Sequence, residues 1–264
     1  MLTLYNGTAS VCSVKVRIGL AEMNLDYEDK LLDLKSGDQH DPDYLNLNPN
    51  GVVPTLVDDS LVVIESSLIL EYLDREHNGG ALMPKGQEAE VTARHWLLRC
   101  LAIHDAINTL TFTTAMREQT LTNKTPEQIS AAIAKMPNPV MRMKRRDLMD
   151  NGLNSGHVDQ ALVILNRMFS DMTSALDKND WVSGPEIGLS DIALIAYVDR
   201  LERLGFAPLF GRDHPNVARW LAAMQARPSY QAEVLKKLPQ EDAEKKRAKG
   251  EAVYWPQLEA RLGN

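Results

Sequence analysis

The pattern of hydrophobic and polar positions changes near residue 80. Before this point, short apolar runs typical of strands alternate with segments in which apolar residues recur at helical spacing. Strand signals lie at 2–5, 27–32, 55–57 and 61–64, and helical signals begin at Val11 and Ser66. Beyond residue 88 the pattern is helical throughout, with no convincing strand. The chain therefore divides into a mixed first part and a helical second part.

The order of the first part is strand, helix, strand, short helix, hairpin and helix. Strands joined by a helical crossover require parallel pairs covered by helices, so this βαβαββα order predicts a thioredoxin-like domain. We place that domain at 1–80, a linker rich in Gly and Pro at 81–88, and an all-helical domain at 89–264. The charged tail around 240–250 is expected to form a frayed or surface-lying helix.

Composition excludes several classes of function. A length of 264 residues with 44% hydrophobic and 25% charged residues is typical of a two-domain globular chain. The net charge of −7 gives no overall field for nucleic acid. The basic run 142–146 is interpreted as a solvated helix face or the rim of a cleft. Two cysteines without a CxxC pair indicate a reducing compartment. We expect a cytoplasmic protein with no signal segment, no membrane contact and no metal site.

Several motifs occur in a specific order. They are Ser10-Val11-Cys12-Ser13-Val14-Lys15-Val16-Arg17-Ile18, Asn48-Pro49-Asn50-Gly51-Val52-Val53-Pro54-Thr55-Leu56, Glu65-Ser66-Ser67, Leu189-Ser190-Asp191 and His214-Pro215-Asn216-Val217. In this order and spacing, over about residues 1–237, the chain resembles serine-type glutathione transferases. Asp38-Gln39-His40, Tyr44 and the insertion at roughly 112–155 resemble the branch of bacterial β-etherases and related fungal transferases. The resemblance implies glutathione as co-substrate and a homodimer.

The candidate chemistry starts at Ser10, between a strand and a helix. A thiolate there can be stabilised by a hydroxyl donor and by the positive end of the helix. The alternative is that Ser10 only caps the helix. Ser13, one turn further, is a second candidate. Cys12 lies between them and is either a buried, inert side chain or a thiol that forms mixed disulfides with glutathione, as in omega-type members.

The resemblance also implies the residues that hold glutathione. Val53 would pair with the cysteinyl residue like an added strand, with Pro54 in a cis peptide bond. Glu65 and Ser66 would bind the γ-glutamyl ammonium and carboxylate, and Gln39 and His40 the glycine end. Each assignment has a structural alternative. Pro54 could be a simple turn proline, Glu65 and Ser66 could only cap the helix, and Gln39 and His40 could lie in a solvated loop.

Three functions are left open. The first is a transferase in which the glutathione thiolate attacks a hydrophobic electrophile. Such an enzyme could cleave aryl ethers, and it would act in detoxification or aromatic catabolism. The second is a glutathione-dependent isomerase or dehalogenase, and the third a non-catalytic ligand carrier. Phe112, Met116 and Met141 are the candidate residues of the substrate pocket. Asp191, at the third position of a helix, is expected to be structural, although Gly188 supplies no capping side chain.

Overall fold

The N-terminal unit builds the mixed sheet predicted from the sequence. A computed structural model describes residues 1–262 of the chain. The elements of this unit are β1 (Leu2–Asn6), α1 (Val11–Glu22), β2 (Glu28–Leu31), a 3-10 turn (Asp38–His40), α2 (Pro42–Leu47), β3 (Thr55–Asp58), β4 (Leu61–Ile64) and α3 (Ser66–His77). The thioredoxin-like βαβαββα order is therefore confirmed.

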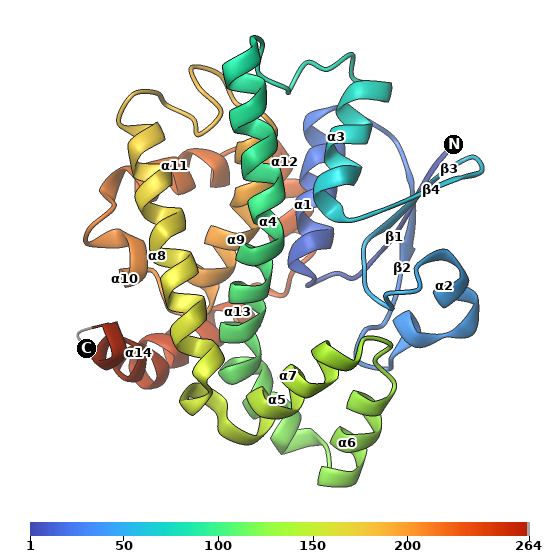
Figure 1. The fold of residues 1–264 in the computed structure, drawn as a ribbon, viewed down its shortest axis with the longest axis vertical. Coiled ribbons are helices and arrows are strands. Elements are labelled where there is room, and N and C mark those ends of the chain that lie inside the picture. Colours follow the sequence, from blue (N-terminus) through green and yellow to red (C-terminus); the bar gives the residue numbers. More distant parts are fainter. Residues whose placement is uncertain (263–264) are drawn as a thin grey trace.

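The sheet has the strand order β2-β1-β3-β4. β1 runs parallel to β2, with Thr3 opposite Glu28, and antiparallel to β3, with Leu4 opposite Leu56. The predicted β3–β4 hairpin is present, but Asp58 belongs to β3 and pairs with Leu61, so the turn comprises residues 59–60. Figure 1 shows α1 and α3 on the side of the sheet that faces the helical unit, and α2 on the other side. The β1–α1 loop consequently opens toward the junction of the two units.

Close packing fixes α1 against α3. A Cβ atom on Gly19 would lie 2.2 Å from a methyl group of Leu70, so only glycine allows this approach. Ile18 and Leu20, on either side of Gly19, are fully buried in the core shared with the helical unit. The start of α1 therefore holds a fixed position relative to the helices beyond residue 80.

The helical unit is built around the long helix α4. Its elements are α4 (Gln87–Thr113), α5 (Ala115–Asn123), α6 (Pro126–Ala134), α7 (Pro139–Asn151), α8 (Gly156–Leu176), α9 (Leu189–Arg203), α10 (Pro208–Gly211), α11 (Pro215–Gln225), α12 (Pro228–Tyr230), α13 (Gln240–Lys249) and α14 (Trp255–Leu262). α4 packs against both α8 and α9. The insertion α5–α7 extends below this bundle in Figure 1 and reaches toward α2.

The linker and the tail are both tied to the core. The buried Asp74 carboxylate accepts hydrogen bonds from the backbone N–H groups of Leu82 and Met83, which fixes the chain between α3 and α4. The charged tail forms α13, and Gly250 then packs so tightly that a Cβ atom there would lie 1.7 Å from the carbonyl oxygen of Leu204. The last two residues of the predicted second domain, 263–264, lie outside the described residues.

Candidate functional site

Ser10 caps α1 and leaves its hydroxyl hydrogen available. Its Oγ accepts the backbone N–H of Ser13 at 3.4 Å, and its side chain is half-buried. Ser13 differs, because it is fully buried and its Oγ accepts the backbone N–H of Gly7 at 3.1 Å. Of the two candidate hydroxyls, that of Ser10 is therefore the more accessible.

The loop that carries Ser10 is fixed by a buried arginine. Arg17 is 1% exposed, and its guanidinium donates to the Oδ1 atom of Asn6 at 2.8 Å and to the carbonyl of Thr8 at 3.0 Å. Glu233 supplies the counter-charge at 3.2 Å. A buried charge is tolerated only with such pairing. The turn before Ser10 therefore keeps one conformation.

Cys12 is paired with a histidine from the second unit. Its Sγ atom lies 3.3 Å from Nδ1 of His104 on α4. Burial raises the pKa of Cys12, but His104, Lys15 and the hydroxyl of Ser66 together outweigh burial and lower the pKa to about 6. Burial lowers the pKa of His104, whereas Cys12 raises it above its ordinary value. The pair thus favours a thiolate beside an imidazolium near neutral pH.

Cys12 lines a pocket of about 390 Å³ between α1, α3 and α4. Lys15, Glu65, Ser66 and Ser67 also line this pocket. Lys15 is buried, and its Nζ donates to the Oγ of Ser67 at 3.0 Å and to the hydroxyl of Tyr197 at 3.1 Å. Within residues 1–262, no carboxylate forms an ion pair with Lys15. Arg94 and Glu71 line the pocket as well, but they pair with each other at 2.9 Å. Lys15 and Glu65 therefore remain as the cation and the carboxylate that complement an amino acid.

The start of α3 is a strained junction at this pocket. Glu65 has a φ of 70°, which is left-handed and unfavourable for a residue with a side chain. Ser66, the first residue of α3, is buried, and Glu65 is exposed. A helix N-terminus offers free N–H groups to an anion. Glu65 and Ser66 thus line the same pocket as Cys12, at the start of α3.

The Val53–Pro54 peptide bond is cis, which confirms the predicted geometry. The preceding turn is held by Tyr44 and Asn48, whose side chains donate to the carbonyl of Val52 at 2.6 and 2.9 Å. No partner within residues 1–262 hydrogen-bonds the N–H or C=O group of Val53. These groups are free to pair with an extended peptide, as a strand edge would.

Gln39 and His40 lie under the tip of the insertion. The buried Oε1 atom of Gln39 has no hydrogen-bond partner within the described residues. A Cβ atom on Gly51 would lie 3.0 Å from the His40 ring and 3.1 Å from the ring of Pro137, so the loop between α6 and α7 rests on this edge of the first unit. Burial and the nearby Lys135 lower the pKa of His40. The insertion therefore spans the junction of the two units.

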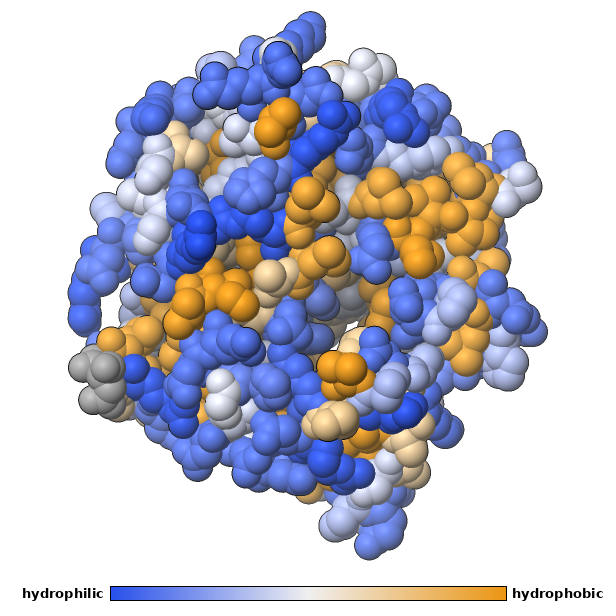
Figure 2. Space-filling view, in the orientation of Figure 1, coloured by the Kyte–Doolittle hydropathy of each residue, from blue (hydrophilic) through white to orange (hydrophobic). Residues whose placement is uncertain are grey.

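The molecular surface is hollowed next to the insertion. Figure 2 shows the hollow between the N-terminal end of α1 and α7. Phe112, near the end of α4, and Met141, on α7, are both half-buried, and Met116 lies on α5. The three predicted substrate residues thus lie on α4, α5 and α7, and α7 borders the hollow.

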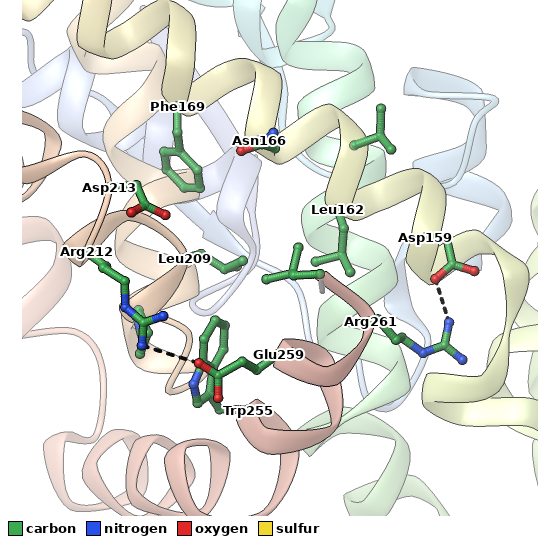
Figure 3. Close-up of a pocket in the computed structure, with 13 residues that line it drawn as sticks. Asp159, Leu162, Asn166, Phe169, Leu209, Arg212, Asp213, Trp255, Glu259 and Arg261 are labelled. Carbon is green, nitrogen blue, oxygen red and sulfur yellow. Dashed lines mark hydrogen bonds and ion pairs between the residues drawn. The ribbon is translucent and has the colours of Figure 1, made fainter. Parts of the chain in front are cut away.

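A second pocket of about 820 Å³ lies far from these residues, between α8 and α14. In Figure 3 both of its arginines are paired with carboxylates: Arg212 with Glu259 at 3.4 Å and Arg261 with Asp159 at 2.6 Å. None of the predicted site residues lines it. This pocket is therefore separate from the residues around Cys12.

Asp191 has the structural role expected of it. Its buried carboxylate accepts the N–H groups of Val182 at 2.8 Å and Gly188 at 3.1 Å and the indole N–H of Trp220 at 2.8 Å. In the described part of the chain, no group of His, Cys, Asp and Glu is arranged to hold a metal ion. None of the described helices has the length and apolar character needed to cross a bilayer.

Two residues of the Cys12 pocket escaped prediction from the sequence. His104 lies 92 residues from Cys12, so no local motif connects them. Lys15 lies in the helix motif at Ser10, but a lysine in an amphipathic helix ordinarily predicts an exposed position. Its occurrence between Val14 and Val16, both buried, is the only local signal of its burial.

Known proteins resemble this chain along most of its length. Residues 1–75 match the N-terminal domain and residues 141–228 the C-terminal domain of glutathione S-transferases. Glutathione S-transferase GstB of Escherichia coli (strain K12) is 28% identical over 89% of this chain and 98% of its own. Tetrachloro-p-hydroquinone reductive dehalogenase of Sphingobium chlorophenolicum is 25% identical over 87% and 94%. The crystal structure of β-etherase LigF from Sphingobium sp. strain SYK-6 superimposes with a TM-score of 0.79, at 25% identity, over 89% of this chain and 99% of LigF. The chain belongs to the glutathione S-transferase superfamily.

Proposed function

We propose that this protein is a glutathione transferase in which the Ser10 hydroxyl donates a hydrogen bond to the glutathione thiolate. Lys15 and Ser66 bind the γ-glutamyl carboxylate, and Glu65 binds its ammonium group. The free backbone groups of Val53 pair with the cysteinyl residue. Gln39 and His40 bind the glycine end, where the Oε1 atom of Gln39 accepts no hydrogen bond from any described residue.

One observation carries this proposal. The Cys12 pocket places Lys15, Glu65 and Ser66 within the first turns of α1 and α3, next to the helix end that Ser10 caps. A free thiol is mostly protonated at neutral pH, since its pKa is about 8.5. A hydroxyl donor and a helix N-terminus both stabilise the thiolate form. The arrangement thus suits a peptide that combines an amino-acid end with a thiol.

Steady-state kinetics with 1-chloro-2,4-dinitrobenzene tests the role of Ser10. Loss of one charge-assisted donor in Ser10→Ala is expected to lower kcat/KM about 10- to 100-fold, with the Kd of glutathione little changed. Ser170→Ala, an exposed serine on α8, is the matched control and should behave as the wild type. Equal kcat/KM for Ser10→Ala and Ser170→Ala would remove Ser10 from the mechanism.

The proposed electrophile is hydrophobic, with aryl ethers as one class. The support is the similarity to β-etherase LigF and the presence of the half-buried, apolar Phe112 and Met141 on α4 and α7. Attack of the thiolate on the carbon next to an ether oxygen forms a thioether and releases a phenolate. Incubation with a panel of aryl ethers and chlorinated aromatics, followed by product analysis, distinguishes this reaction from isomerisation, which returns glutathione unchanged.

The Cys12–His104 pair favours a second activity, thiol exchange. The Cys12 thiolate can attack the sulfur of a compound GS–X, which forms a mixed disulfide and releases X as an anion. A second glutathione thiolate then attacks the mixed disulfide and gives glutathione disulfide and the Cys12 thiolate. Tetrachloro-p-hydroquinone reductive dehalogenase, whose name states a reductive reaction, is among the relatives.

Mass spectrometry of the intact protein tests this second activity. After incubation with glutathione disulfide, one glutathione adduct is expected on the wild type and on Cys100→Ala, because Cys100 is buried. Cys12→Ala should form none. An adduct on Cys12→Ala, or its absence from the wild type, would contradict thiol exchange at Cys12.

We also propose a homodimer through α3, α4 and β4. Leu98 and Leu101 on α4 are 69% and 60% exposed, and Leu61, Val62 and Leu68 are exposed beside them. Figure 2 shows apolar side chains gathered over this face. Because Leu68, Leu98 and Leu101 also line the Cys12 pocket, a partner here would cover its open side.

Light scattering measures the oligomeric state directly. The double variant Leu98→Glu/Leu101→Glu should be monomeric, since buried, unpaired charges oppose association. Val163→Glu, which alters an exposed position on α8, should remain dimeric. A monomeric wild type, or a dimeric double variant, would contradict this interface.

A further inference from the structure

The basic run 142–146 on α7 contains one cation that has no ion-pair or hydrogen-bond partner in the part of the chain that the structure describes. Its other cations are engaged by protein oxygen atoms: Arg142 by the carbonyl of Met136 at 2.7 Å, Lys144 by the Asp105 carboxylate at 2.6 Å and Arg146 by the Ser130 hydroxyl at 3.0 Å. Within residues 1–262, Arg145 has no carboxylate partner and no hydrogen-bond acceptor. This difference sets Arg145 apart from a merely solvated basic face.

Arg145 instead stacks on an aromatic ring. Its guanidinium carbon lies 3.1 Å from the centroid of the Phe112 ring, and the residue is half-buried. Desolvation lowers the pKa of Arg145 to about 10, with no compensating anion. A cation–π contact offsets only part of the free energy lost when a cation leaves water. An unpaired guanidinium in such a place is best explained by an anion that arrives with a ligand.

The position of Arg145 relates it to the reactive end of the cleft. Phe112 follows His104 by eight residues on α4, which corresponds to about 12 Å along a helix. Met141 lies one turn before Arg145 on the same side of α7. Figure 2 shows the hollow extending from the start of α1 to α7. Arg145 therefore belongs to the helix that borders this hollow opposite the start of α1, where the sulfur of glutathione would lie.

We propose that Arg145, stacked on Phe112, binds a carboxylate on the electrophilic substrate and thereby selects aromatic carboxylic acids. This inference rests on the proposed transferase function. The planar guanidinium matches a carboxylate in a bidentate geometry. One unpaired cation neutralises one negative charge, and Lys144 is already paired with Asp105, so a carboxylate fits better than a phosphate dianion.

Calorimetric titration in saturating glutathione tests the proposal with a matched pair of probes, 4-phenoxybenzoate and its neutral amide, 4-phenoxybenzamide. The wild type should bind the acid about 10- to 100-fold more tightly than the amide. Arg145→Gln should lose this preference and keep its affinity for the amide. Arg146→Gln removes the same charge from the same helix and should retain the preference. Arg145→Lys, which keeps the charge without the planar fork, should show an intermediate preference and serves as the readout if Arg145→Gln does not fold.

The outcomes separate this inference from the function on which it rests. Equal affinity of the wild type for acid and amide, or no binding of the acid, would overturn the role of Arg145. Loss of the acid preference in Arg146→Gln as large as in Arg145→Gln would do the same, because it would indicate a diffuse field. Failure to bind glutathione in the same calorimeter would overturn the transferase proposal. The acid–amide comparison needs no turnover, so it remains informative in that case.

Discussion

Replacement of His104 by glutamine should return Cys12 to the behaviour of an ordinary thiol. Burial raises the pKa of Cys12, and the imidazole 3.3 Å away is the first of the groups that lower it to about 6. A thiol with this pKa is about 90% ionised at about pH 7, whereas one with a pKa near 9 is about 1% ionised. Removal of the imidazole leaves burial opposed only by Lys15 and Ser66, so the pKa should move toward 9.

The rate of Cys12 alkylation measured at a single pH underestimates this change in the pKa of Cys12. Ionisation falls about 90-fold, but a thiolate of higher pKa is intrinsically more nucleophilic, by about 20-fold over three pH units at a Brønsted slope of 0.4–0.5. The net rate near neutral pH should therefore fall only about fourfold. The midpoint of the pH profile is the stronger readout, because the rate rises with pH through the pKa of the thiol.

Alkylation by iodoacetamide, followed by intact mass spectrometry in the Cys100→Ala background, measures this midpoint. The wild-type midpoint should lie near pH 6, and that of His104→Gln toward 9. His95→Gln, an exposed histidine on the same helix, should keep the wild-type midpoint. A wild-type midpoint near 8.5, or a profile of His104→Gln that coincides with the wild type, would refute the thiolate–imidazolium pair.

Two further predictions concern stability. Asp191→Ala should lower the free energy of unfolding by about 3–5 kcal/mol, since the indole of Trp220 and two backbone N–H groups lose their buried acceptor. Chemical denaturation measures this loss, with Asp150→Ala, at an exposed position, as the control. An equal loss of stability in the two variants would contradict the prediction. Gly250→Ala should displace α13 and α14, because its Cβ atom would lie 1.7 Å from the Leu204 carbonyl oxygen. Limited proteolysis should then cut the tail of Gly250→Ala faster than the tail of the control variant Gly156→Ala, whose new Cβ atom would meet nothing within 4 Å. Equal cleavage rates in the two variants would refute the tight contact at Gly250.

The order of elements could be predicted because the local signals were consistent with one another. Strand alternation, turn residues and helical spacing all changed at the same points, and the turn at 48–51 followed by Val53-Pro54 indicated a specific loop. Ser66 was predicted to begin a helix and does so. These features are determined by residues close together in the chain, so they can be predicted from the local sequence.

The pairings that define the site depend on the tertiary fold. Cys12 could be interpreted as an inert side chain or as a thiol that reacts with glutathione, and only the approach of His104 from α4 distinguishes the two environments. Arg145 appeared in a basic run that suits a solvated face or the rim of a cleft. Its contact with Phe112 arises because α7 folds back along α4.

Ultraviolet absorbance of the thiolate on addition of glutathione tests the central claim most directly. In a Cys12→Ala background, which removes the protein's own thiolate, the Ser10-containing protein should show the thiolate band of bound glutathione near neutral pH. The Ser10→Ala/Cys12→Ala variant should bind glutathione and show the band only at a higher pH. Glutathione that binds with its sulfur protonated in the presence of Ser10, or a band equally strong without it, would contradict the account.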